Sequence, residues 1–168
     1  MNNLPQLKIR NIKVSVILEQ DLDLDTSFSS ISKYDNLILT VYPNKRNLVN
    51  VTKIQSIDQL MKLDKIISSK FNNQCKKVRI DSIMLSRKVK NRQFSLKKML
   101  ETCRQHQADF KLDFNVESFH APWIKSNFGS FNLFISGSST VMGCRKLSDI
   151  DKIQEFLAKV YCKENEIK

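Results

Sequence analysis

The chain is poor in the residues that make linkers and flexible tails, with 3 glycines and 3 prolines among 168 residues. It has no Gly-rich phosphate loop and no G-x-S-x-G nucleophile elbow. It also lacks a signal-peptide pattern and any apolar run long enough to cross a bilayer. These absences argue against a nucleotide-dependent enzyme, a hydrolase and a membrane protein, and we expect an intracellular protein.

The cysteines do not form a metal-binding pattern. Cys75, Cys103, Cys144 and Cys162 contain no C-x-x-C pair, and Cys103 with His106 makes one isolated C-x-x-H. A structural zinc site needs four ligands, so we expect reduced, packed thiols, no metal and no cofactor.

Positive charge is the strongest bulk feature. The chain has 28 Lys and Arg against 17 Asp and Glu, a net charge of +11 and a pI near 9.6. Within residues 76–98, which are rich in Lys and Arg, Asp81 is the one acidic residue. A polyanion such as DNA is the natural partner of this charge, although a solvated basic surface explains it as well.

Alternating and helical patterns predict two halves with the same element order. Strands are expected at 7–18, 36–42, 47–54, 78–89, 109–117, 119–127, 130–137 and 139–146. A short helix is possible from Asp25 through Ile31. Helices are expected after Ser56, whose S-x-x-Q capping box precedes the apolar stripe Ile57, Leu60, Met61, Ile67 and Phe71, and after Ser95 and Ser148.

This order defines an internal repeat, which we place at residues 1–73 and 74–168 of one continuous domain. The first copy is shorter by about two short strands and a turn.

Several short motifs carry a resemblance to one family. L-F-I-S-G at Leu133–Gly137 and T-V-M-G-C-R at Thr140–Arg145 resemble the L-I-F-V-S-G and V-L-T-G-A-K hairpin of the TATA-box-binding protein (TBP) family. Asn11–Val16, Leu22–Thr26 and Val49–Ser56 are similar to that family's N-I-V-x-T-V, L-D-L-K-T and M-V-V-T-G-A-K-S.

The resemblance implies an α+β saddle: a curved antiparallel sheet of both repeats, with helices on its convex face. In that family the concave face lies in a widened minor groove, and phenylalanines wedge between base steps.

The resemblance also implies site residues. Asn11 matches an asparagine that contacts minor-groove bases, and Ser82 is its counterpart in the second repeat. The other matching positions on the DNA-binding concave face are Lys13, Asn50, Thr52, Met84, Thr140 and Met142. The wedge positions are Phe119 and Phe134, and the phosphate contacts are Lys125 and Arg145. The family has asparagine where this chain has Ser82, and valine where it has Lys13 and Met84.

Strand periodicity supports one of these assignments independently. Asn132, Phe134 and Ser136 share one strand face, whereas Leu133 and Ile135 share the other and are expected in the core. A phenylalanine between two polar residues fits a face that opens a base step, but an ordinary exposed aromatic, or one packed on Phe119, remains the alternative.

The first repeat departs from the family because it has no phenylalanine pair; Leu39 or Val41 is the nearest candidate. We therefore expect an asymmetric or weaker kink, more contact with phosphates and a looser sequence preference.

The favoured function is a transcription initiation factor that binds the minor groove of A/T-rich promoter DNA. Its partners would be double-stranded DNA, a TFIIB-like factor and RNA polymerase subunits, with no membrane and no small-molecule substrate. Such a reduced version would suit a large DNA virus, and its location would be the nucleus, or the cytoplasm in a viral factory or a prokaryotic-type cell.

Two other classes of function compete with this one. One is a protein-interaction module that keeps the fold and has weak or no specific DNA binding. An enzyme is not expected, because Asp109 and Asp113, on one predicted strand face, are typical of solvated carboxylates, and His106 and His120 have no visible partners.

Overall fold

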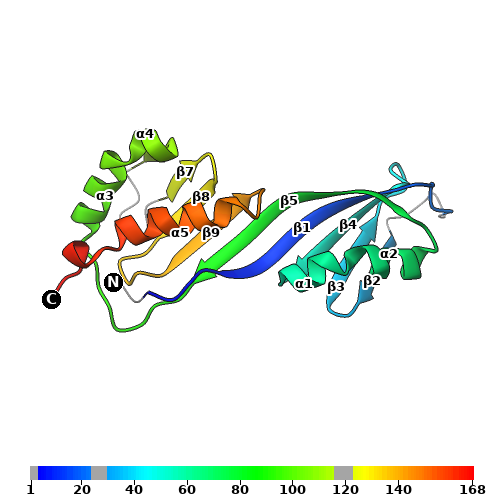
Figure 1. The fold of residues 1–168 in the computed structure, drawn as a ribbon, viewed down its shortest axis with the longest axis horizontal. Coiled ribbons are helices and arrows are strands. Elements are labelled where there is room, and N and C mark those ends of the chain that lie inside the picture. Colours follow the sequence, from blue (N-terminus) through cyan, green and yellow to red (C-terminus); the bar gives the residue numbers. More distant parts are fainter. Residues whose placement is uncertain (1–3, 24–29, 116–122) are drawn as a thin grey trace. The chain divides into compact units, whose positions relative to one another are not determined.

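The computed structural model describes residues 4–23, 30–115 and 123–168 of an α+β protein (Figure 1). The strands pair in the order β2-β3-β4-β1-β5-β9-β8-β7-β6. The chain divides into two compact units. We call Ile9–Ser82 the N-terminal unit, and Ile83–Lys168 together with the residues up to Lys8 the C-terminal unit. Strand β5 (Cys75–Arg87) contributes residues to both.

The described part of the N-terminal unit contains four strands, of which β1 starts one residue before the unit, and two short helices. These are β1 (Lys8–Leu18), β2 (Ser30–Tyr34), β3 (Leu37–Val41), β4 (Leu48–Ile54), α1 (Ile57–Met61) and α2 (Leu63–Phe71). Alternate strand residues such as Val14, Leu39 and Val51 are fully buried, as are Leu63 and Ile67 of α2. The strand period of two therefore gives this sheet one core face and one uncovered face.

The C-terminal unit repeats this plan with additional elements. Its elements are α3 (Leu96–Gln105), α4 (Gln107–Phe110), β6 (Asp113–Asn115), β7 (Trp123–Ser126), β8 (Gly129–Leu133), β9 (Ser139–Cys144), α5 (Asp149–Val160) and the 3-10 turn Lys163–Asn165. Helix α5 covers one sheet face, because its Phe156 ring lies 5.2 Å from that of Phe131 on β8 and 5.0 Å from that of Phe110.

A β-bulge at the same place in each unit shows that the repeat is structural. In the N-terminal unit the register of β1 with β4 shifts between Ile12 and Val14, and in the other unit that of β5 with β9 shifts between Ile83 and Leu85. The extra residues fall in β4 and β9, where Lys53 and Gly143 have φ angles of 67° and 76°. The register thus matches positions on β1 and β4 to positions on β5 and β9.

Several predicted elements are confirmed. The hairpin β3–β4, the strand β5, the helix after Ser95 and the closing helix α5 lie where the patterns placed them. The Ser56 hydroxyl caps α1 by accepting from the backbone N–H of Gln59 at 3.1 Å, whereas the Ser148 side chain makes no capping bond.

Other predicted elements are wrong. Asp109 and Phe110 belong to helix α4, which ends where Lys111 takes a left-handed φ of 47°, so Asp109 and Asp113 do not share a strand face. The helix after Ser56 breaks at Lys62, and Ile57 and Met61 are 49% and 76% exposed.

The difference between the repeats also has another origin than expected. The longer copy gains α3, α4 and β6, for which the described residues of the N-terminal unit have no counterpart. Ile31 lies in strand β2 rather than in a helix, and the start of that predicted helix, at Asp25, lies outside the described residues.

Candidate nucleic-acid interface

In each unit the described helices leave one sheet face uncovered, which we call its open face. In the C-terminal unit a row of paired residues crosses this face, from Ser86 through Thr140 and Asn132 to Trp123. Cross-strand partners share a face, and these residues alternate with the buried Phe131, Leu133 and Val141. The predicted Asn132 and Thr140 therefore lie side by side on the open face.

The N-terminal unit has the matching row, from Ser15 through Asn50 and Thr40 to Ile31. Its outermost residue, Ile31, is 68% exposed, and its counterpart Trp123 is 40% exposed. Neither residue was predicted from the sequence to belong to the site. An exposed apolar side chain thus occupies the matching position of both rows, on the edge strand β2 of the N-terminal unit and on β7 of the C-terminal unit, where β6 pairs beyond it.

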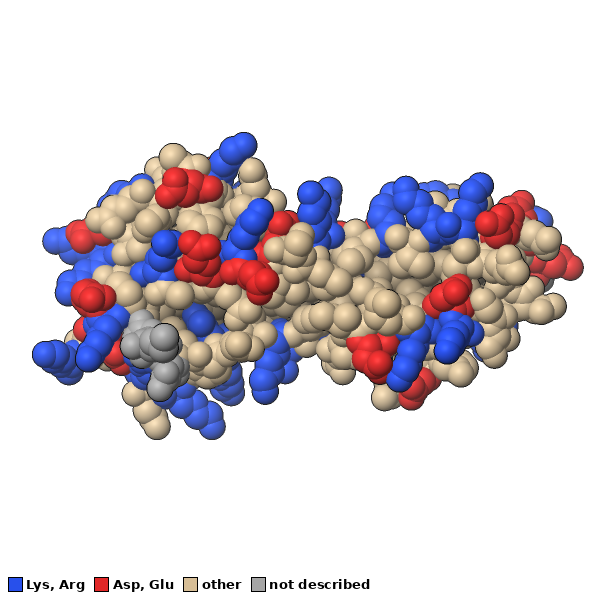
Figure 2. All heavy atoms as spheres, in the orientation of Figure 1, with Lys and Arg blue, Asp and Glu red and all other residues tan. Residues whose placement is uncertain are grey.

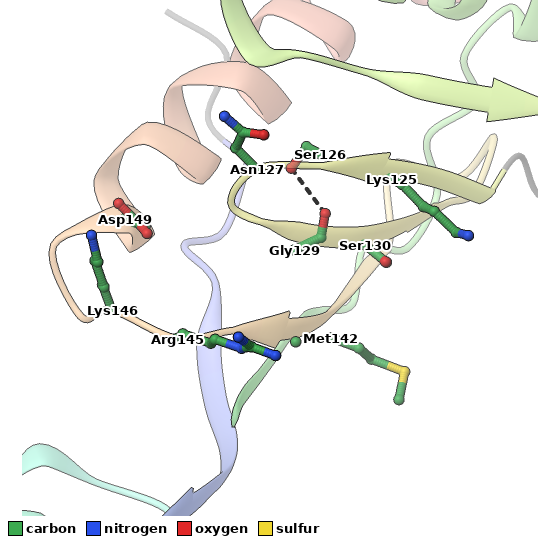
Figure 3. A pocket seen from close by; sticks show the side chains of 10 residues that line it. Lys125, Ser126, Asn127, Gly129, Ser130, Met142, Arg145, Lys146 and Asp149 are labelled. Atoms are coloured by element: carbon green, nitrogen blue, oxygen red, sulfur yellow. Dashed lines mark hydrogen bonds between the residues drawn. The ribbon is translucent and has the colours of Figure 1, made fainter. Parts of the chain in front are cut away.

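The predicted phosphate contacts come together in a hollow of the C-terminal unit. This hollow, of about 420 Å³, lies between the β7–β8 turn and the segment after β9 (Figure 3). Lys125, Arg145 and Lys146 contribute three cations to it, and Asp149 contributes one carboxylate. Met142, predicted on the concave face, lines the same hollow. The net positive charge suits an anionic ligand such as a phosphate.

Phe134 follows the last residue of β8 and is 36% exposed. It begins a tight turn, residues 134–138, closed by bonds from Phe134 N to Ser138 O at 3.1 Å and from Gly137 N to Phe134 O at 2.9 Å. Because the strand ends at Leu133, Ile135 does not continue into the core and is 40% exposed. The prediction that Leu133 is buried is confirmed, and the prediction for Ile135 is wrong.

Buried groups hold the carbonyls of this turn. The Tyr161 hydroxyl lies 3.0 Å from Phe134 O and 3.1 Å from Ser138 O, and Arg87 Nε donates to Gly137 O at 3.2 Å. Burial raises the pKa of Tyr161 to about 12, so its phenol remains a donor at neutral pH. These hydrogen bonds hold the backbone of the turn that carries Phe134 in one conformation.

The register reveals a second exposed aromatic that the sequence reasoning missed. Leu133 pairs with Ser139 just before Phe134, and Val41 pairs with Val49 just before Tyr42. Tyr42 therefore occupies in the N-terminal unit the place of Phe134, and it is 39% exposed. Leu39 and Val41, which the sequence offered as wedge candidates, are 0% and 2% exposed and face the core.

A second hollow, of about 400 Å³, opens on the N-terminal unit's face. The predicted residues Lys13, Asn50 and Thr52 line it together with Tyr42 and Lys45. The structure thus brings three of the predicted residues together in one hollow and adds an aromatic and a cation to it.

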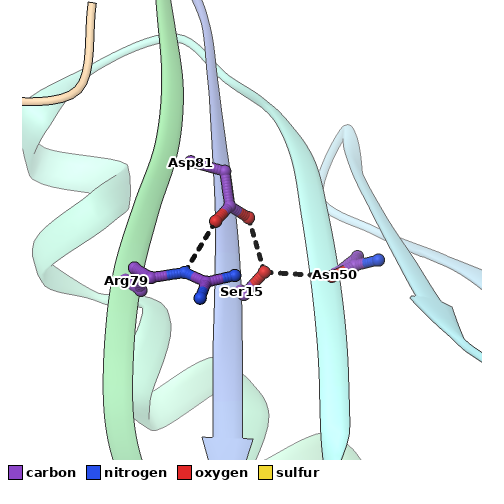
Figure 4. A network of polar contacts seen from close by, with 4 residues as sticks. All are labelled: Ser15, Asn50, Arg79 and Asp81. Atoms are coloured by element: carbon purple, nitrogen blue, oxygen red, sulfur yellow. Dashed lines mark hydrogen bonds and ion pairs between the residues drawn. The ribbon is translucent and has the colours of Figure 1, made fainter. Parts of the chain in front are cut away.

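A polar network crosses the floor of this second hollow (Figure 4). Ser15 Oγ donates to Asp81 Oδ2 at 2.5 Å and lies 3.2 Å from Asn50 Oδ1, and Arg79 Nε donates to Asp81 Oδ1 at 2.9 Å. The four side chains project in front of the strands, with helix ribbons behind. The one sequence feature that pointed to this network was Asp81, the single acidic residue within the basic segment 76–98.

The remaining residues predicted on the concave face lie on the long strands. Asn11 Oδ1 accepts from the bulge N–H of Lys53 at 2.8 Å, which directs the amide so that its NH2 group stays available as a donor. Ser82 and Met84 lie on β5 and are half-buried. Phe119 lies outside the described residues.

Other chemistries find little support in the described residues. They hold no group of three His, Cys, Asp or Glu arranged for a metal ion, and no helix long and apolar enough to span a membrane. Burial raises the pKa of the Cys103 thiol to about 12, which makes it a poor nucleophile. On the face seen in Figure 2, Lys and Arg are spread over both units with acidic side chains between them.

Two strand-and-helix units, each with the same bulge and the same open face, define an α+β protein with a TBP-like fold. Among solved structures, Methanococcus jannaschii TBP matches 93% of this chain and 98% of its own, with a TM-score of 0.61 and 14% identity. No family model and no curated protein sequence matches the chain. The predicted fold class is confirmed.

Proposed function

We propose that the protein binds double-stranded DNA with its two open faces, in the minor groove of A/T-rich promoter sequence. The observation that carries this proposal is the recurrence of an exposed aromatic at one position of both units, Phe134 and Tyr42. Exposed rings beside cations suit minor-groove binding, because rings can enter a base step while cations hold the flanking phosphates.

The DNA-bound protein would act as a transcription initiation factor that recruits a TFIIB-like factor and RNA polymerase. Methanococcus jannaschii TBP, which shares the fold, is named for TATA-box binding, and the net charge of +11 fits a DNA partner. A/T-rich DNA suits such a site because TA steps unstack easily.

A protein-interaction module remains the second candidate. The carboxylate of Asp81 lies on the open face of the N-terminal unit, where it disfavours a phosphate and would suit a basic partner protein. Binding of a duplex with strong salt dependence separates the two functions, because only DNA releases condensed counterions.

Arg145→Ala should weaken the binding of all duplexes alike, because its guanidinium is assigned to a phosphate rather than to a base. The slope of log K against log salt should fall by about one. Titrations of two unrelated duplexes at several salt concentrations measure this. Arg104→Ala, on the exposed side of α3, removes the same charge away from the open face and should change the slope less. Weakening confined to one sequence would contradict the phosphate role.

Tyr42→Ala should reduce the bend in the bound duplex and weaken binding by about 1–3 kcal/mol, the scale of aromatic–base stacking. Tyr34→Ala is the matched control, because Tyr34 is 40% exposed but pairs with the buried Leu37 and so lies on the other face. Energy transfer between dyes at the duplex ends reports the bend. Equal effects of the two substitutions would show that Tyr42 does not contact the DNA.

A further inference from the structure

Asp81 is an acidic side chain at the floor of a hollow that is otherwise lined by cationic, polar and apolar groups. Lys13, Lys45 and Arg79 line this hollow of the N-terminal unit, and no second carboxylate is among the described residues around it. The Asp81 side chain is 34% exposed, so ligands can reach it. The carboxylate sits where the proposed function places base edges.

The network around Asp81 holds the carboxylate without saturating it. Oδ1 accepts from Arg79 and Oδ2 accepts from Ser15, whereas a carboxylate offers about four lone-pair sites. Ser15 is 4% exposed, and its buried hydroxyl holds Oδ2 of Asp81 in place. The Arg79 side chain is 65% exposed, so this ion pair alone contributes little to stability. The arrangement therefore leaves acceptor capacity on a group of fixed position.

The chemistry of the minor groove offers one type of donor for such an acceptor. A·T pairs present only acceptors there, and a G·C pair adds the N2 amino group of guanine. A carboxylate facing an A·T pair or a phosphate would be repelled, whereas one facing guanine N2 gains a charge-assisted hydrogen bond.

We propose that Asp81, positioned by Ser15 and Arg79, accepts a hydrogen bond from the amino group of a guanine in the bound duplex. This inference rests on the proposed function. It makes Asp81 a specificity-determining residue: the duplex segment on the N-terminal unit contains a G·C pair, while the aromatics act on A/T-rich steps.

The test replaces guanine by inosine, which lacks the amino group and keeps the other two hydrogen bonds to cytosine. A preferred duplex is first selected with the full chain, and each G·C pair in it is then changed to I·C. The wild-type protein should lose about ten-fold in affinity at one position, the scale of one hydrogen bond to a charged group. Asp81→Ala should bind the G and I duplexes equally.

Asp58→Ala is the matched control. Asp58→Ala changes the net charge by the same amount as Asp81→Ala. Asp58 lies on helix α1 and forms an exposed ion pair with Lys62 at 2.8 Å. This variant should keep the preference for guanine. Asp81→Asn retains the size and one acceptor oxygen, and it should keep a reduced preference if Asp81→Ala fails to fold.

The outcomes separate the two proposals. Equal binding of every G and I duplex by the wild-type protein, in complexes that still bend DNA, overturns the role of Asp81 alone. A guanine preference that survives in Asp81→Ala, or in Asp81→Asn at full strength, also overturns it. Failure to bind or bend any duplex overturns the proposed function together with this inference.

Discussion

Phe134→Ala is expected to give a protein that still binds duplex DNA but bends it much less. Removing the ring removes the group that would open a base step, and specific binding should weaken by a few kcal/mol, the scale of one unstacked step. Non-specific binding should persist, because the cations Lys125, Arg145 and Lys146 remain. Energy transfer between dyes at the two duplex ends measures the bend, and competition titrations measure the affinity.

The effect should be large because the turn is already ordered. Hydrogen bonds from Tyr161 and Arg87 hold its carbonyls, so little entropy is lost when the ring enters a step. Ile135→Ala provides the control, since Ile135 lies in the same turn and is 40% exposed. Unchanged energy transfer in Phe134→Ala, or the same loss in Ile135→Ala, would show that Phe134 is an ordinary exposed aromatic.

Phe156→Ala should lower the free energy of unfolding by about 3–5 kcal/mol, the usual cost of removing a buried ring. Phe156 is fully buried, and its ring lies between those of Phe110 and Phe131, at 5.0 and 5.2 Å. Urea denaturation followed by circular dichroism measures the change. Because Phe131 and Asn132 are neighbours on β8, the loosened core should also weaken DNA binding in this unit.

Glu155→Ala on the same helix is the comparison. Its carboxylate is exposed and lies 3.6 Å from Lys159, a surface pair of small energetic value. Its effect should stay within about 0.5 kcal/mol. A loss below about 1 kcal/mol in Phe156→Ala would mean that the aromatic cluster does not hold α5 on the sheet.

Much of this fold could be predicted from local patterns. Long alternating strands such as β1 and β5, the capping serine at 56 and the apolar stripe of α5 each point to one structure. Short segments were ambiguous, because Asp109–Phe110 fits the period of a strand as well as that of a helix. The left-handed conformation of Lys111, which ends α4, could not be predicted from the hydrophobic pattern. The break at Lys62 could not be predicted either, because Ile57 and Met61 continue the apolar stripe although both side chains are exposed.

The candidate site was only partly predictable, for a related reason. Lys125 and Arg145 could be proposed from the family resemblance, and the structure places both in one hollow. Tyr42 could not, because its match to Phe134 depends on cross-strand register, which loops of different length conceal in the sequence. The contact of Ser15 with Asp81 joins residues 66 positions apart, and no local pattern encodes it.

The two units share a plan but differ in chemistry, because Tyr42 and Asp81 line the hollow of one unit, and Met142 and Arg145 line that of the other. A self-complementary duplex offers the same groups to both halves, and this protein cannot match them equally. Its best binding sequence should therefore be non-palindromic. Under the proposed function, a complex on such a sequence would have a polarity and would distinguish upstream from downstream before any other protein arrives.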